Sequence, residues 1–138
     1  MTPTETPLYI SDFITGVLAA LALKNLAPVS LRGNRLDQAF GRLYEDLKRE
    51  ANEEGFSLRF RIVPHQLHGN SETLHQALYD AAKRDLISLD NPEFQDLRLK
   101  IQPDEAMYYF NTITGKPEMY KKLADMFLKH YREVGLER

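Results

Sequence analysis

The hydrophobic period of residues 71–101 changes from helical to alternating, and this change constrains the fold more than any other feature of the chain. Apolar residues from Leu74 to Ala81 are first spaced i, i+4 and i+7, which places them on one face of a helix. Apolar and polar residues then alternate in 87–89 and again in 97–101, as they do in strands with one buried face. We therefore expect a helix that leads directly into a pair of strands.

Residues 90–92, Asp-Asn-Pro, supply the turn between the two strands. Asp and Asn side chains bond to their own backbone, and Pro fixes φ and lacks an N–H donor, so this tripeptide suits a connection. A helix followed by a two-stranded ribbon resembles the end of a winged helix-turn-helix domain. The resemblance covers residues 71–101 and implies that the helix enters the major groove of DNA while the ribbon contacts the backbone.

That resemblance implies a set of DNA contacts on the outer face of the helix and on the ribbon. Gln and Arg suit bidentate contacts with bases, and Lys and Arg neutralise phosphates. However, residues 71–101 hold four basic and six acidic residues, so DNA binding needs further cations, such as Arg32, Arg35, Arg59 and Arg61. The implied contacts are His75, Gln76, Tyr79, Lys83 and Arg84 on the helix, with Arg98 and Lys100 on the ribbon.

Together with the rest of the sequence pattern, this predicts an α+β, helix-rich single domain. We expect it to be winged-helix-like, with a small antiparallel sheet and a C-terminal helix. An extended N-terminal arm is expected at 1–10 and the domain at 11–135. A strand and the loop PHQLHGN separate the second and third helices, whereas a winged helix joins them by a short turn. The other expected elements are a core helix at 11–24, a short strand at 29–31, a helix at 34–55, a strand at 56–63, a short helix or third strand at 103–115, and a helix from Pro117 to Gly135.

Composition sets the class of protein. The chain has 138 residues, of which 43% are hydrophobic and 28% charged, and these values are ordinary for one globular domain. A net charge of −2 predicts no bulk attraction to nucleic acid or to anionic membranes. The apolar run that ends at Lys24 is too short to span a bilayer. Without Cys or a visible signal peptide, a cytoplasmic location is expected.

No catalytic or cofactor motif is present, so we expect neither enzymatic activity nor a cofactor. The sequence lacks G-x-S-x-G, a P-loop and G-x-G-x-x-G. His65, His68, His75 and nearby Glu72 match no zinc-ligand spacing, so surface histidines are favoured over a metal site. Residues 31–35, Leu-Arg-Gly-Asn-Arg, precede a helix and offer a phosphate N–H groups and arginines, although a helix-entry turn explains them equally well.

The last helix carries an apolar stripe that admits two interpretations. It contains Met and aromatic side chains, which are common at adaptable protein surfaces. The stripe either packs on the chain's own core or, if it is left uncovered, pairs with a second copy in a homodimer. A protein-interaction module with the same fold is therefore the alternative to DNA binding. The candidate interface residues are Met119, Leu123, Met126, Phe127 and His130.

Overall fold

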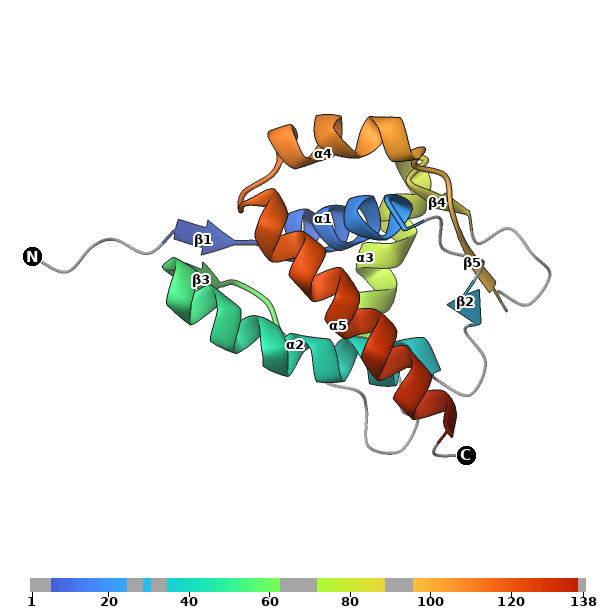
Figure 1. Ribbon diagram of the computed structural model, residues 1–138, viewed down its shortest axis with the longest axis horizontal. Coiled ribbons are helices and arrows are strands. Elements are labelled where there is room, and N and C mark those ends of the chain that lie inside the picture. The colour runs from blue at the N-terminus through green and yellow to red at the C-terminus, as the bar shows by residue number, and fades with distance from the viewer. Residues whose placement is uncertain (1–5, 25–28, 31–34, 63–71, 89–95, 137–138) are drawn as a thin grey trace, which may run out of the picture.

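In the computed structural model, helix α1 (Ile10–Ala22) lies at the centre of the molecule, with α4 (Ala106–Thr112) above it and α2 (Arg35–Glu54) below it in Figure 1. Helix α5 (Pro117–Leu136) crosses in front of α1 in the same view. The structure describes residues 6–24, 29–30, 35–62, 72–88 and 96–136. Every residue from Phe13 to Ala22 is buried. A helix that is apolar on all sides must be covered on all sides, and α3, α4 and α5 all pack against α1.

Four further helices surround α1, and the predicted α+β, helix-rich class with a C-terminal helix is confirmed. The segment after Pro103 is helical, so the alternative of a third strand there is wrong. The last helix ends one residue beyond Gly135, which was expected to terminate it. Gly55, with φ +79°, follows α2 in the left-handed conformation that ends helices. These helices are α2 (Arg35–Glu54), α3 (Glu72–Lys83), α4 (Ala106–Thr112, after a 3₁₀ turn at Pro103–Glu105) and α5 (Pro117–Leu136).

The expected ribbon is present. Strand β4 (Ile87–Ser88) pairs antiparallel with β5 (Asp96–Leu99), with Ile87 opposite Leu99. Strand β2 (Val29–Ser30) pairs with the other edge of β5, so the antiparallel sheet has the order β2-β5-β4. The proposed turn at 90–92 lies outside the described residues. The change of hydrophobic period thus marked the end of α3 correctly.

A second, parallel sheet joins the N-terminus to the segment after α2. Strand β1 (Thr6–Leu8) pairs with β3 (Phe56–Leu58), and Leu8 is fully buried. Residues 6–10 therefore belong to the domain and not to an arm outside it. The strand expected at 56–63 is only three residues long because β1, its partner, has only three. Beyond the pairing the alternation continues, with Arg59 and Arg61 exposed and Ile62 buried.

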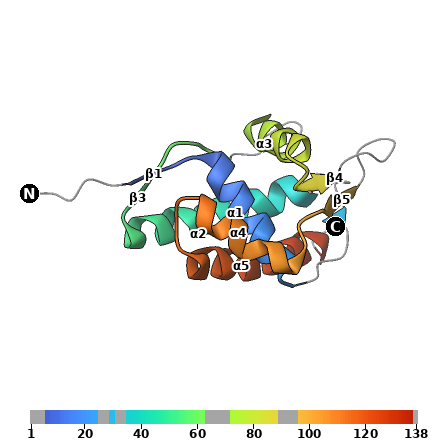
Figure 2. The ribbon, with the colours of Figure 1, turned by 90° about the horizontal axis from the view of Figure 1, so that it is seen from above.

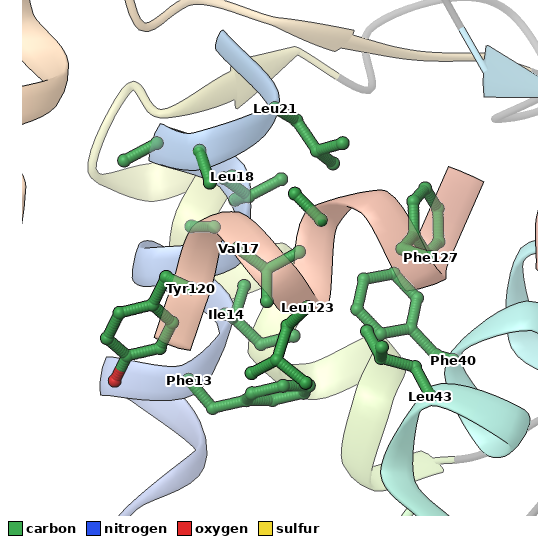
Figure 3. Close-up of a cluster of buried hydrophobic side chains, with 14 of the residues drawn as sticks. Phe13, Ile14, Val17, Leu18, Leu21, Phe40, Leu43, Tyr120, Leu123 and Phe127 are labelled. Atoms are coloured by element: carbon green, nitrogen blue, oxygen red, sulfur yellow. The ribbon is translucent and has the colours of Figure 1, made fainter. Parts of the chain in front are cut away.

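The core is densest where α5 crosses α1 and α2 (Figure 3). A Cβ at Gly16 would overlap the ring of Tyr120, so glycine allows the two helices to approach closely. The rings of Phe40 and Phe127 lie 4.9 Å apart between α2 and α5. The Tyr120 hydroxyl donates to the Thr114 carbonyl. Burial, together with the Asp12 carboxylate, raises the pKa of this phenol, so it keeps its proton at neutral pH.

The stripe of α5 is covered by the chain's own helices, so the interface expected there is wrong. Met119, Leu123 and Phe127 are each at most 4% exposed, and they pack in the main core. Met126 is partly buried against the same core. His130 is partly buried, and its Nε2 lies 2.5 Å from Asp46 Oδ2 on α2. These contacts cover the stripe within one chain. The stripe therefore packs on the chain's own core, as the first of the two interpretations expects.

No helix within the described residues is long and apolar enough to cross a membrane.

Candidate nucleic-acid interface

Helix α3 has one buried face and one open face. The buried face holds Leu74, Ala77, Leu78 and Ala81, and α3 packs against α1. Helix α3 itself lies on the side of the molecule opposite α5 (Figure 2). Tyr79 is 45% exposed, and Gln76 and Lys83 are also exposed. We refer to Gln76, Tyr79 and Lys83, which follow one another at i, i+3 and i+7, as the open face of α3.

A tight turn at Asp85 fixes α3 to the ribbon. Asp85 has a φ of +61°, the left-handed conformation in which helices commonly end. The Leu86 N–H donates to Ala81 O at 3.0 Å and the Asp85 N–H to Ala82 O at 3.1 Å. This pair of bonds is the Schellman motif, with Asp in the place usually taken by Gly. Strand β4 begins two residues later, so the helix and the ribbon leave the turn in a defined relative direction.

The ribbon adds two basic side chains beside this turn. Lys100 Nζ lies 3.2 Å from Asp85 Oδ1, and the Lys100 N–H donates to Leu86 O at 2.9 Å. Lys100 therefore neutralises Asp85 and extends the pairing of β5 back to the turn. Arg98 is exposed and lies opposite Ser88 in the ribbon. Of the two predicted ribbon contacts, Arg98 is thus the better placed to meet a ligand.

Two of the predicted contact residues are bound to the chain's own core. His75 Nε2 lies 2.8 Å from Oδ1 of the buried Asp37 on α2. Arg84 Nη2 donates to Oγ1 of the buried Thr15 on α1 at 2.9 Å. His75 and Arg84 both keep part of their surface exposed. The structure therefore separates these two residues from the open face of α3, although the sequence pattern had grouped them with it.

The charges around the open face are mixed. Gln76 Nε2 donates to Asp80 Oδ1 at 3.3 Å, so a carboxylate lies on the face that would approach phosphates. Arg59 and Arg61 are exposed, and the segment that carries them passes along the same side of the molecule as α3 (Figure 2). Arg35 is engaged elsewhere: its Nε donates to Tyr131 O at 2.9 Å, and its guanidinium stacks on the Tyr131 ring. Arg32 lies outside the described residues.

The residues considered for metal or phosphate binding lie largely outside the described part of the chain. Within the described ranges, no three His, Asp or Glu side chains converge as metal ligands do. His65 and His68 lie outside those ranges, and His75 is held by Asp37. Of the segment 31–35 considered for phosphate binding, only Arg35 is described. An open depression on the outer face of α2 is lined by charged and polar side chains and encloses no buried group (Glu45, Lys48, Arg49 and Asn52).

Sequence reasoning missed three residues that shape this interface. Thr15 and Asp37 lie on helices distant from α3 in the chain, so the periodicity of α3 cannot reveal them. A polar residue within an apolar run, such as Thr15 in α1, is the signal that could have suggested a buried hydrogen-bond partner. Asp85 could have been recognised as a helix end, because Asp tolerates the left-handed conformation better than most residues.

Comparison of the chain with models of protein families, with curated proteins and with solved structures gives no match. The function is therefore inferred from the geometry of this chain alone.

Proposed function

We propose that this protein is a cytoplasmic, non-enzymatic regulator that binds duplex DNA, with α3 in the major groove and the β4–β5 ribbon against the backbone. The observation that carries the proposal is the exposure of Gln76, Tyr79 and Lys83 on the open face of α3, which the turn at Asp85 joins to the ribbon. The element order is α1-β2-α2-β3-α3-β4-β5, so β3 separates two helices that a short turn joins in a winged helix. The sheet order β2-β5-β4 and the passage of α3 into the ribbon favour a winged-helix-like arrangement.

Each residue of the proposed contact surface has a chemical role. Gln76 can pair with N6 and N7 of adenine, and its bond to Asp80 is exposed, so DNA can displace it. Lys83, at the last turn of α3, and Arg98 on the ribbon supply cations for phosphates on either side of the groove. Tyr79, one turn before Lys83 on α3, is 45% exposed, so part of its aromatic side chain can meet the groove.

The net charge of −2 weighs against strong binding, because phosphate neutralisation supplies most non-specific affinity. The distribution of charge reduces this difficulty. Lys100 pairs with Asp85, and Arg59 and Arg61 extend the basic surface beyond α3. Among the described side chains of this face, Asp80 is an acidic residue that would oppose DNA. We therefore expect measurable binding at low salt that weakens steeply as salt is added.

Fluorescence anisotropy with a labelled duplex of mixed sequence, titrated with protein at several salt concentrations, tests the proposal. Lys83→Ala and Arg98→Ala should each weaken binding and reduce the slope of log K against log salt by about one, because each removes one phosphate contact. The matched control is Lys121→Ala, at an exposed position of α5, the helix on the side of the molecule opposite α3. It should bind as the wild type does.

Failure of the wild-type protein to bind duplex DNA at low ionic strength would contradict the proposal. So would an equal loss of binding in Lys121→Ala and in Lys83→Ala, since that result would indicate diffuse charge attraction without a defined surface. Circular dichroism of each variant establishes that the fold is retained.

A protein-interaction module is the second candidate, and α4 favours it. Met107 and Tyr108 on this helix are 51% and 67% exposed, and the segment 106–115 contains no Asp, Glu, Lys or Arg. An uncharged surface with exposed aromatic and Met side chains is typical of protein contacts. If the protein binds no DNA and sediments as a dimer that Met107→Ser and Tyr108→Ser dissociate, this candidate replaces the first.

A further inference from the structure

Most of the buried polar side chains in the described core contact α3 or the residue that follows it. Among the described residues, three polar or charged side chains are classed as buried: Thr15, Asp37 and Asp46. Thr15 binds Arg84 and Asp37 binds His75, so two of the three contact the same twelve-residue helix or the residue that follows it. The third, Asp46, contacts Arg49 and His130 and joins α2 to α5.

The two contacts hold opposite ends of α3. His75 is in the first turn of the helix and connects it to the first turn of α2, where Asp37 lies. Arg84 directly follows the last helical residue and connects that end to the middle of α1, at Thr15. Two directional contacts, one at each end, restrict both the tilt of a helix and its rotation about its own axis.

Apolar packing alone restricts α3 less. Its buried face contains two alanines, Ala77 and Ala81, whose small side chains interlock little with neighbouring helices. The hydrophobic effect is non-directional and depends chiefly on buried area, so it tolerates small rotations of such a helix. A hydrogen bond does not, because its energy falls when distance and angle depart from their narrow optimum. Moreover, a rotation that breaks either contact leaves Asp37 or Thr15 buried without that partner.

We propose that His75 and Arg84 are positioning residues, which hold α3 at a fixed orientation on α1 and α2 so that its open face is preorganised for a ligand. The effect on DNA binding rests on the proposed function, whereas the effect on α3 itself does not. DNA then meets Gln76, Tyr79 and Lys83 without first ordering the helix that carries them. This assignment removes His75 and Arg84 from the set of direct DNA contacts implied by the sequence pattern.

Substitutions in the buried partners test the proposal without altering α3 or its charge. Thr15→Val has nearly the same shape as threonine but lacks the hydroxyl acceptor, whereas Thr15→Ser keeps it. Asp37→Leu removes the partner of His75, whereas Asp37→Asn keeps an oxygen that can accept from it. Hydrogen exchange of the free protein should show that amides of α3 exchange about tenfold faster in Thr15→Val and Asp37→Leu, with α5 unchanged. The two conservative variants should exchange as the wild type does.

DNA binding adds a second measurement that separates positioning from contact. Thr15→Val should weaken binding about tenfold and leave the salt slope unchanged, because every cation remains in place. Arg84→Met, which keeps the length of the side chain, should also leave that slope unchanged. A slope reduced by about one in Arg84→Met would identify Arg84 as a phosphate contact and overturn its assignment here.

The two proposals fail in different ways. If exchange from α3 is the same in Thr15→Val, Thr15→Ser and the wild type, the positioning role of Arg84 is wrong whether or not DNA binds. Likewise, if exchange from α3 is the same in Asp37→Leu, Asp37→Asn and the wild type, the positioning role of His75 is wrong. If exchange responds as expected but the wild type binds no duplex DNA, then positioning stands and only the proposed function is wrong.

Discussion

Helices α3 and α5 both have a clear stripe of residues that suggests a contact surface, yet the stripe of α5 is buried and that of α3 is exposed. The stripe of α5 is buried against α1 and α2, with Phe127 in contact with Phe40. The open face of α3 is exposed, and α3 lies on the side of the molecule opposite α5 (Figure 2). A periodic stripe thus identifies residues that share one face of a helix, but not whether the same chain buries that face.

The largest effect is expected on the α5 side of this comparison. Phe127→Ala should lower the free energy of unfolding by about 3–5 kcal/mol, because it leaves a cavity between α2 and α5. Urea denaturation measures this loss, and Lys121→Ala, at an exposed position of the same helix, should stay within about 0.5 kcal/mol of the wild type. If Phe127→Ala instead left the stability unchanged and converted a dimer to a monomer, the stripe would be an interface between two copies of the chain.

Gly16→Ala should have the next largest effect, since the added Cβ would overlap the Tyr120 ring where α1 and α5 cross. Alanine favours helices over glycine, but we expect the overlap to dominate and to lower the free energy of unfolding by about 1–3 kcal/mol. The double variant Gly16→Ala/Tyr120→Leu, in which the ring is gone, should lose less than the sum of the two single variants. Strict additivity would show that the close approach of the helices is not the cause.

On the α3 side, the turn at Asp85 is the sensitive point for stability. Asp85→Val places a β-branched residue at φ +61° and should cost about 1–2 kcal/mol. Asp85→Gly suits that backbone conformation and removes only the exposed pair with Lys100, so its stability should change little. Chemical denaturation of the two variants makes the comparison. Equal losses would indicate that the carboxylate, and not the backbone conformation, is what matters at this position.

The smallest effect is expected from Asp80→Asn on the open face of α3. Stability should not change, and affinity for duplex DNA should rise about two- to threefold, because a negative charge is removed from the surface that meets phosphates. Anisotropy titrations at one salt concentration measure this difference. Glu118→Gln on α5 removes the same charge from the opposite side and is the matched control. An equal rise in both variants would mean that only net charge matters.

Local sequence patterns predicted the elements well. The change of period after Leu86 located the end of α3 and the start of the ribbon, and the uniformly apolar run from Phe13 marked the central helix. Gly55 and Pro117 marked helix ends where the structure has them. These features depend on residues a few positions apart, whose preferences are expressed in the local backbone.

Contacts between distant segments were not predictable in the same way. Strands β1 and β3 are parallel and separated by two helices, so no turn sequence announces their pairing. Thr15 and Arg84 are 69 residues apart, and their bond depends on how α1 and α3 pack in three dimensions. The covered stripe of α5 belongs to the same class, because burial there is decided by α1 and α2. The sequence therefore predicted the exposed residues of the candidate site, but not the buried residues Thr15 and Asp37 that contact its helix.

The central claim, that the open face of α3 binds DNA, is tested most directly by an NMR titration of the ¹⁵N-labelled protein with a short duplex at low salt. The largest shifts should occur at Gln76, Tyr79, Lys83 and Arg98, while Lys121 and Lys129 on α5 should not move. Shifts confined to α4 or α5, or no shift at any residue, would contradict the claim.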